Sequence, residues 1–316
     1  MKASICTLFE GHYHFGVGGL ANSLYQNGFR GNFYAGYRGS LPVWANDAKI
    51  NTSINWEGAS TLNIKNEFFV HFLPLKVDIH LTNHKPSFVL DLINKVDLNA
   101  ESFFYFDPDI VVKCNWNFFE KWVDFGVTLV HEIVNHDMGP THPTRLEWKQ
   151  IIHKHGHEIK REVYSYINAG FFGLKRNHTD FLIKYIEFID SMASDPSVDL
   201  TTFSFLQDRS HPFFAKDQDA LNIAAMCCDV SISEVGPDGM DFVYGGFIMA
   251  HATGLPKPWK KPYLLSALYG KPPSRAEKLF WNYVSDPFPL YSNTYYMFKK
   301  AAINVTAFIG RFYRKY

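Results

Sequence analysis

The sequence predicts an α/β fold with a mixed, mostly parallel sheet that is flanked by helices. Two observations predict it. Short apolar strands alternate with segments of helical periodicity, and the chain opens with strand, helix and strand at the spacing of a parallel crossover. The 316 residues are 47% hydrophobic, which is enough for a large core. We predict a main domain over residues 1–265 and a helical C-terminal extension over 266–316.

The first part of the chain carries the parallel opening. An apolar strand is predicted over residues 3–9. A glycine-rich segment over 11–19 then leads to a helix over 20–26, which Asn27-Gly28 ends as a C-terminal cap. A polar, turn-rich stretch covers 40–66. The other strands predicted in this part are 33–37, 68–75 and 102–106, and the other helices are 87–96 and 116–122.

The second part of the chain alternates in the same way. Its predicted strands are 127–130, 164–167 and 247–250, and its predicted helices are 181–192 and 217–228. Thr179 or Asp180 is a cap candidate for the first of these helices. Residues 135–160 are rich in His, Pro and charged residues, and this composition predicts a loop or a small subdomain.

Composition narrows the class of function. Lys plus Arg and Asp plus Glu both number 31, so the formal net charge is zero, which disfavours a nucleic-acid-binding protein. No C-x-x-C spacing occurs among the four cysteines, which we expect to be reduced thiols: Cys6, Cys114, Cys227 and Cys228. The N-terminal residues lack the apolar stretch of a signal peptide, and no apolar run is long enough to span a membrane. We therefore expect a cytoplasmic protein.

An acidic pair follows an aromatic strand at Phe106-Asp107-Pro108-Asp109. Residues i and i+2 of an extended segment point to the same side, and Pro108 disfavours a helix. The two carboxylates should therefore project together from the end of the strand. Carboxylate oxygens suit a hard divalent cation. The pair predicts a metal site and, with it, a ligand that carries phosphate.

Three later segments place polar side chains at the ends of predicted elements. Asn168-Ala169-Gly170 ends a strand with an amide for hydroxyl or phosphate groups and a glycine that lets a ligand approach. Asp217-Gln218 opens a helix, where the two side chains either cap the helix or face a polar ligand. His251 follows a strand and can complete an oxygen-rich metal site, while Lys257 carries a charge that suits phosphate.

Two other patterns are set aside. Residues 16–21, Gly-Val-Gly-Gly-Leu-Ala, fit the G-x-G-x-x-A dinucleotide fingerprint, but six residues separate them from the strand end at Phe9, and the fingerprint needs a tight turn. A histidine-rich stretch has no accompanying cysteine, so a solvated loop is favoured over a zinc site. Its histidines are His131, His136, His142, His153, His155 and His157.

In their order along the chain, these segments resemble nucleotide-sugar glycosyltransferases of the GT-A fold, and most closely glycosyltransferase family 8. The matching strings are Thr7 in the first strand, Asp107-Pro108-Asp109, Asn168-Ala169-Gly170, Asp217-Gln218-Asp219-x-Leu221-Asn222 and His251-x-x-Gly254-x-x-Lys257-Pro258-Trp259. The last string is the most specific, and the resemblance covers residues 3–262. It implies a metal-dependent, retaining enzyme. Such an enzyme moves a sugar from a nucleotide-sugar donor, usually a UDP-sugar, to a saccharide or glycolipid acceptor in cell-surface polysaccharide or lipopolysaccharide synthesis.

The resemblance also implies a role for each matching residue. Asp107, Asp109 and His251 would hold Mn²⁺ (or Mg²⁺) against the donor diphosphate, which Gly254 and Lys257 would contact. The other residues implied to surround the donor are Thr7, Phe9 and Glu10 at the nucleoside, Asn168, Ala169, Asp217 and Gln218 at the sugar, and Lys85 nearby. Of these, Asp217 and Gln218 would occupy the catalytic position.

The sequence departs from this family in two places. Leu129-Val130-His131-Glu132 stands where the family has an acidic segment of small residues, and Glu10-Gly11-His12-Tyr13-His14 replaces its pattern after the first strand. Two other functions stay open. One is a sugar-nucleotide nucleotidyltransferase, although residues 11–19 contain no Lys or Arg; the other is a non-catalytic binding protein at a membrane.

The C-terminal extension has a composition of its own, because no acidic residue follows Asp286. Its basic residues are Lys299, Lys300, Arg311, Arg314 and Lys315, and they lie among Tyr295, Tyr296, Met297, Phe298, Phe308, Ile309, Phe312 and Tyr313. A basic and aromatic helix suits adsorption on an anionic membrane surface. It equally suits a helix that packs back on the domain, so both alternatives stay open.

Overall fold

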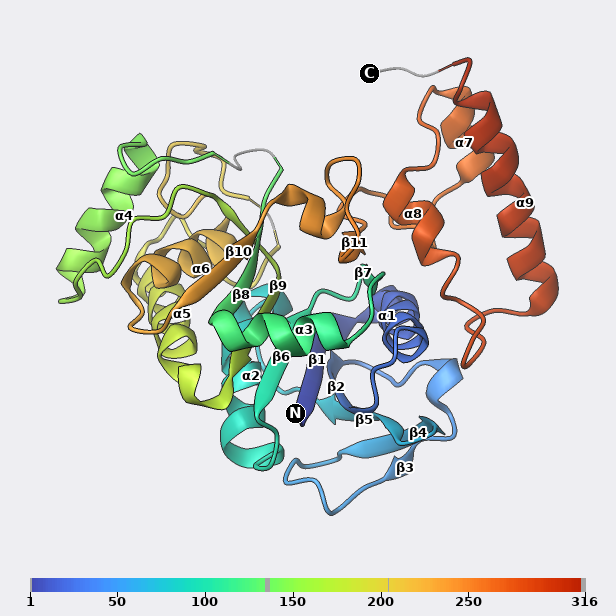
Figure 1. The fold of residues 1–316 in the computed structure, drawn as a ribbon, viewed down its shortest axis with the longest axis horizontal. Helices are drawn as coiled ribbons and strands as arrows, with labels where there is room; N and C mark the ends of the chain where they lie inside the picture. Colours follow the sequence, from blue (N-terminus) through green and yellow to red (C-terminus); the bar gives the residue numbers. More distant parts are fainter. Residues whose placement is uncertain (1, 134–136, 204, 314–316) are drawn as a thin grey trace.

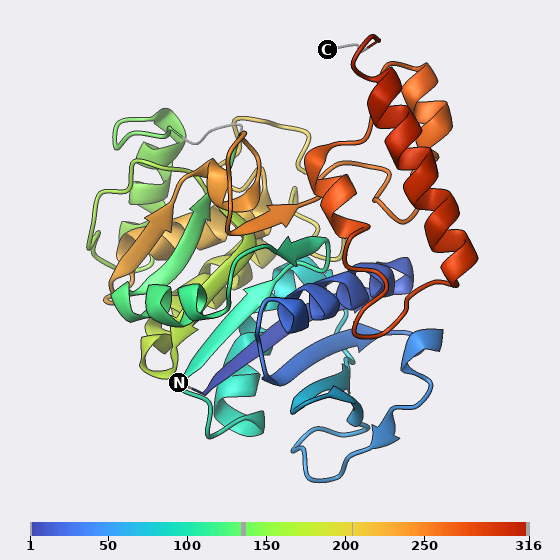
Figure 2. The ribbon, with the colours of Figure 1, turned by 45° about the vertical axis from the view of Figure 1, so that its right-hand side comes forward.

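A nine-stranded mixed sheet forms the centre of the protein, and helices cover both of its faces (Figures 1 and 2). The computed structural model describes residues 2–133, 137–203 and 205–313. The strand order is β10-β8-β9-β6-β1-β2-β5-β4-β3. These strands are β1 (Ala3–Glu10), β2 (Gly31–Arg38), β3 (Lys49–Ile50), β4 (Ser60–Lys65), β5 (Phe68–Pro74), β6 (Ser102–Phe106), β8 (Val127–His131), β9 (Ile167–Lys175) and β10 (Ile232–Val235). The predicted fold class is confirmed.

Two helical layers enclose the sheet. Helices α1 (His14–Gln26) and α3 (Asn117–Trp122) pack on one face (Figure 1). A core of aromatic and aliphatic side chains lies beneath them. Helices α2 (Leu81–Asp91), α5 (Thr179–Ser191) and α6 (Lys216–Cys227) pack on the other face, with α4 (Pro143–Lys154) beside α6. Both faces of the central strands are therefore buried, which explains their nearly continuous apolar sequences.

The strand directions bring several chain segments to one edge of the sheet. β1 is parallel to β2 and β6, whereas β9 runs antiparallel between β6 and β8. The carboxyl ends of β1, β6 and β8 therefore meet the beginning of β9. A small antiparallel pair, β7 (Ile110–Val112) with β11 (Met249–His251), lies just beyond the end of β6. The segments that carry the predicted metal and sugar residues reach this edge or follow it closely.

The glycine-rich segment is part of a helix, which corrects the predicted start of the first helix at residue 20. α1 begins at His14 and contains Gly16, Gly18 and Gly19. Each glycine lies where a Cβ would collide with a neighbour: the backbone carbonyl of Pro108, the side chain of Leu290, and, at 2.7 Å, Phe280. Close packing, rather than a phosphate-binding turn, accounts for these glycines.

Other details of the helices and strands also differ from prediction or add to it. β9 begins at Ile167, so residues 168–170 open a strand rather than end one. α2 begins at Leu81, capped by His80 and continuing through Pro86, and a π-helical turn covers 92–96. Neither Thr179 nor Asp180 caps α5, because both lie in its first turn and His178 precedes them. Residues 143–154 form α4 within the segment predicted as a loop or a small subdomain, and the turn-rich stretch contains β3 and β4.

The C-terminal segment is helical, as predicted, with α7 (Tyr263–Leu268), α8 (Arg275–Phe280) and α9 (Asn293–Ile309). Its middle part packs on the domain: Asn22 of α1 donates hydrogen bonds to the carbonyls of Tyr283 and Phe288. Within the described residues, no helix has the length and apolar character needed to cross a bilayer. Arg314 and Lys315, like His136 earlier in the chain, lie outside the described residues.

Candidate metal and donor site

The acidic pair and His251 converge at the carboxyl edge of the sheet. Asp107 leaves β6 in a turn in which the Ile110 amide donates to the Asp107 carbonyl, 3.1 Å away. Asp109 immediately precedes β7, and β11 carries His251 back beside it. Asp107, Asp109 and His251 each present one ligand atom, and these atoms lie within 4.8 Å of one another. The chain thus places two carboxylates and an imidazole where one cation could bind all three.

His251 is held by its surroundings. Its Nε2 lies 3.1 Å from Asp109 Oδ1, while its Nδ1 is buried and lacks a hydrogen-bond partner among the described residues. The ring packs against Gly170, where a Cβ would come 2.5 Å from His251 Cε1. Buried polar atoms in proteins nearly always have partners, so the orphan Nδ1 of an imidazole that also contacts Asp109 fits a site that receives a ligand.

Lys257 lies on the other side of Asp109. Its Nζ is 2.5 Å from Asp109 Oδ2 and also donates to the carbonyls of Ala252 and Thr253. Burial by itself would raise the pKa of Asp109, but the neighbouring His251 and Lys257 hold that pKa well below its usual range. Asp109 is therefore a carboxylate, the form that binds cations.

Lys85 is buried next to the metal-site residues. Its Nζ is 3.1 Å from Asp107 Oδ1, 3.0 Å from Asp217 Oδ2 and 3.1 Å from the Ala169 carbonyl. An ammonium group has three N–H donors, and these three acceptors use all of them. Burial lowers the pKa of Lys85, but the two carboxylates outweigh this effect and raise it. Lys85 thus joins a metal-site carboxylate to the start of α6 and has no free donor for a diphosphate.

The beginning of β9 is bound to α6. The Ala169 amide donates to Gln218 Oε1 at 3.2 Å, and Asn222 bonds both the amide and the carbonyl of Ile167. The Asn168 side chain accepts from the Gly170 amide at 2.8 Å and donates to Glu132 at 2.5 Å. The predicted sugar-binding residues are therefore neighbours, linked by their own hydrogen bonds.

The residues predicted at the nucleoside are arranged less favourably. Thr7 and Phe9 are buried in β1, and Phe9 packs on Tyr37 at 5.8 Å between ring centroids. Glu10 is half-exposed and forms an ion pair with Arg38 at 2.8 Å. Of the three, Glu10 alone offers an accessible side chain. Gly254, predicted at the diphosphate, is exposed, with open space around it.

Sequence reasoning missed three side chains at this edge. Tyr105 donates to Asp107 Oδ1 at 2.9 Å, Glu132 accepts from Asn168, and Arg38 holds Glu10. Two of them had a signal. Tyr105 lies two residues before Asp107 and so shares its side of the strand, and Glu132 is the second residue after the strand predicted over 127–130. Arg38 had none, because an ion pair over 28 residues leaves no local pattern.

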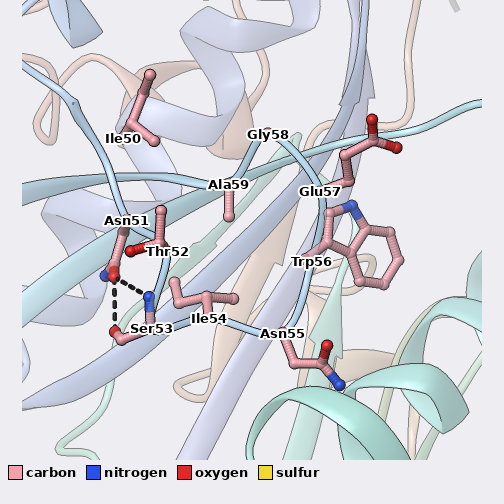
Figure 3. A pocket seen from close by; sticks show the side chains of 10 residues that line it. All are labelled: Ile50, Asn51, Thr52, Ser53, Ile54, Asn55, Trp56, Glu57, Gly58 and Ala59. Atoms are coloured by element: carbon pink, nitrogen blue, oxygen red, sulfur yellow. Dashed lines mark hydrogen bonds between the residues drawn. The ribbon is translucent and has the colours of Figure 1, made fainter.

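A pocket of about 420 Å³ lies elsewhere, lined by residues 50–59 of the loop between β3 and β4 (Figure 3). Asn51 hydrogen-bonds Ser53 within the loop, and the lining contains one charged residue, Glu57. None of the predicted site residues lines it. The pocket is the concave side of a single turn and carries no group of reactive side chains.

Comparison with known proteins gives a result for the structure but not for the sequence. No protein-family model matches the chain, and no curated protein matches its sequence. Among solved structures, the chain is similar to the apo structure of WbbM, a bifunctional glycosyltransferase, with a TM-score of 0.54 and 11% sequence identity. The similarity covers 95% of this chain and 51% of that one, so the chain spans about half of WbbM. At this identity the likeness shows the overall fold alone.

Proposed function

We propose that this chain is a divalent-metal-dependent, retaining glycosyltransferase of the family 8 type. It would move a sugar from a UDP-sugar to a saccharide or glycolipid acceptor in the synthesis of cell-surface polysaccharide or lipopolysaccharide. The observation that carries the proposal is the convergence of Asp107, Asp109 and His251 within 4.8 Å, in a fold that resembles a glycosyltransferase.

The residues present fit a hard divalent cation. Two carboxylates and one imidazole are ligands that Mn²⁺ and Mg²⁺ accept, and the buried His251 Nδ1 has no partner among the described atoms. Asp107, Asp109 and His251 would hold the ion, which would stabilise the negative charge that develops on the departing diphosphate.

The remaining residues would bind and orient the donor. Lys257 already donates to Asp109, Ala252 and Thr253, so it would act on the diphosphate through its positive charge. Glu10 would face the nucleoside. Asn168 and Asp217 would contact the sugar hydroxyls. Gln218 is a poor nucleophile, since its amide oxygen already accepts from the Ala169 amide. This favours attack by the acceptor hydroxyl on the face from which the diphosphate leaves. The new bond joins the acceptor oxygen to the anomeric carbon, the bond from that carbon to the diphosphate breaks, and the hydroxyl proton passes to the diphosphate oxygen.

The test is Mn²⁺-dependent release of UDP from a panel of UDP-sugars. Asp109→Asn and His251→Ala should each lower the rate by on the order of 10²–10³. Asp124→Asn, at a surface carboxylate paired with Lys175, should leave it unchanged. Calorimetry with UDP and Mn²⁺ separates the enzyme from a non-catalytic scaffold, because the enzyme should bind UDP in a metal-dependent way and the scaffold should not. Unaltered turnover in Asp109→Asn or His251→Ala would reject the site.

A further inference from the structure

Helix α9 carries an apolar stripe that is exposed and covers none of the residues that the structure describes. Phe298, Val305 and Phe308 are each more than half exposed, and their spacing of seven and three residues places them on one side of the helix. Another side of the same helix is buried through Ala302 and Ile303. α9 is therefore apolar on two sides, of which one packs against the protein and the other faces outward.

Helix α7 exposes apolar side chains in the same part of the molecule. α7 and α9 pack against each other at one end of the protein, away from the central sheet (Figures 1 and 2). Leu264, Leu265 and Leu268 are about half or more exposed, and Tyr269 follows them. We call the exposed apolar residues of the two helices the α7–α9 face. They are Leu264, Leu265, Leu268, Tyr269, Met297, Phe298, Val305 and Phe308.

Positive charge is concentrated in the same segment. By sequence, residues 260–316 contain ten basic and two acidic residues, whereas residues 1–259 contain 21 basic and 29 acidic ones. The formal net charge of the whole chain is zero, but residues 260–316 are strongly basic. Lys260, Lys271, Lys278 and Arg311 are exposed there, while one of the two acids, Glu277, is buried in an ion pair with Lys261.

We propose that the α7–α9 face docks onto an anionic lipid bilayer. Exposed Leu and Phe beside Lys and Arg are the combination that holds peripheral helices at a charged membrane surface. A second copy of this chain is a poorer occupant, because it would set one strongly basic segment against another without a counter-charge. The docking argument does not depend on the proposed function.

The geometry of α9 indicates that the helix lies on the bilayer. It has 17 residues, and its middle includes Lys299, Lys300 and Asn304. Tyr269 and Tyr295 are exposed beside the apolar residues, and tyrosines favour the boundary between headgroups and acyl chains. Only three residues separate Trp259 from α7, so the docked helices directly continue the segment that supplies Lys257 to the candidate site.

Vesicle sedimentation of the full chain tests the proposal. We expect binding to vesicles of phosphatidylcholine mixed with phosphatidylglycerol, weak binding to phosphatidylcholine alone, and release by salt. The double variant Leu268→Ser with Phe308→Ser should lower the partition coefficient by about tenfold or more. Lys271→Gln and Arg311→Gln should each lower it by on the order of fivefold.

The control is Phe125→Ser, which removes an exposed phenylalanine on another part of the protein and should change nothing. Equal binding to both kinds of vesicle, or equal loss in Phe125→Ser and the double variant, overturns the proposal. A stable dimer that Phe308→Ser dissociates, without vesicle binding, also overturns it. Mn²⁺-dependent UDP binding, measured on the same samples, shows that the variants are folded. Its absence in all of them would count against the proposed function and leave the docking result intact.

Discussion

Gly170 lies directly against the imidazole of His251, and a Cβ at Gly170 would come 2.5 Å from the ring carbon Cε1 and 2.9 Å from Nδ1. The two residues belong to β9 and β11, which are separate in sequence and lie in different sheets. Because Gly170 has no side chain, the His251 ring can occupy the space beside it. His251 cannot easily yield, because β11 is paired with β7 and its ring is buried.

Gly170→Ala should therefore displace the imidazole. We expect the affinity for Mn²⁺, measured through metal-dependent UDP binding, to fall by about 10–100-fold, as when residues that orient a metal ligand are lost. The unfolding free energy should fall by about 1–3 kcal/mol from overpacking. Gly139→Ala is the matched control, since no described residue lies within 4 Å of a Cβ there. Equal metal affinity in the two variants would contradict this assignment.

Lys85→Met should leave Asp107 and Asp217 as buried carboxylates without their counter-ion. Removing one partner from a buried ion pair costs about 3–5 kcal/mol of stability. Because Asp107 is also a candidate metal ligand, added Mn²⁺ should recover part of this loss. Urea unfolding with and without Mn²⁺ measures both effects.

Two comparisons sharpen the Lys85 experiment. Lys76→Met removes a lysine whose ion pair with Glu57 is exposed, and it should cost no more than about 1 kcal/mol. Lys85→Arg keeps the positive charge, but no nitrogen of a guanidinium group carries three N–H donors, so arginine cannot bond all three acceptors from one atom. If Lys85→Met were as stable as the natural protein without metal, Lys85 would not hold the two carboxylates together.

Gly16→Ala tests the contact between α1 and the turn that carries Asp107 and Asp109. Alanine favours a helix over glycine by up to about 1 kcal/mol. At Gly16, however, the new methyl group would meet the backbone carbonyl of Pro108, between Asp107 and Asp109. Because a backbone carbonyl moves less easily than the end of a side chain, the overpacking cost of about 1–3 kcal/mol should exceed the gain in helix propensity. Gly18→Ala is the control, because its neighbour is the flexible end of Leu290. We expect weaker Mn²⁺-dependent UDP binding in Gly16→Ala alone.

The same glycines show how far the sequence could be interpreted. The strand over 102–106 was predicted at its observed bounds, because an apolar aromatic run ended by Asp-Pro-Asp is a strong local signal. The start of α1 was placed six residues too late, because three glycines in six residues argue against a helix. Only the contacts of these glycines with residues 108, 280 and 290 explain them, and contacts over such separations leave no local pattern.

The candidate site also contains some features that the sequence predicted and others that it could not predict. Spacing within a strand was enough to pair Asp107 with Asp109, and the order of the strings brought His251 to them. The engagement of Lys85 could not be predicted, because its partners lie 22 and 132 residues away. Nor could the burial of Thr7 and Phe9, since a strand buried on both faces has the same apolar sequence whether or not its end lines a pocket.

His71 gives the fold a dependence on pH that is separate from the candidate site. Its Nδ1 is 2.8 Å from Thr61 Oγ1 and its Nε2 is 3.1 Å from Asn32 Oδ1, so β5 is bonded to both neighbouring strands through one imidazole. Burial lowers the pKa of His71 to about 4, from an ordinary value of 6.5. Between pH 6.5 and 4, His71 is therefore protonated in the unfolded chain but stays neutral in the folded chain.

The contribution of His71 is fully present above pH 6.5 and is lost as the pH falls towards 4. A difference of this size in pKa corresponds to about 3 kcal/mol. His71→Gln retains an amide for hydrogen bonds but does not titrate. It should cost about 1 kcal/mol at pH 8, and its stability should change less than that of the natural protein between pH 6.5 and 4. The difference between the two urea-unfolding curves removes the effect of the other histidines. Parallel curves across that range would show that His71 is not the group responsible.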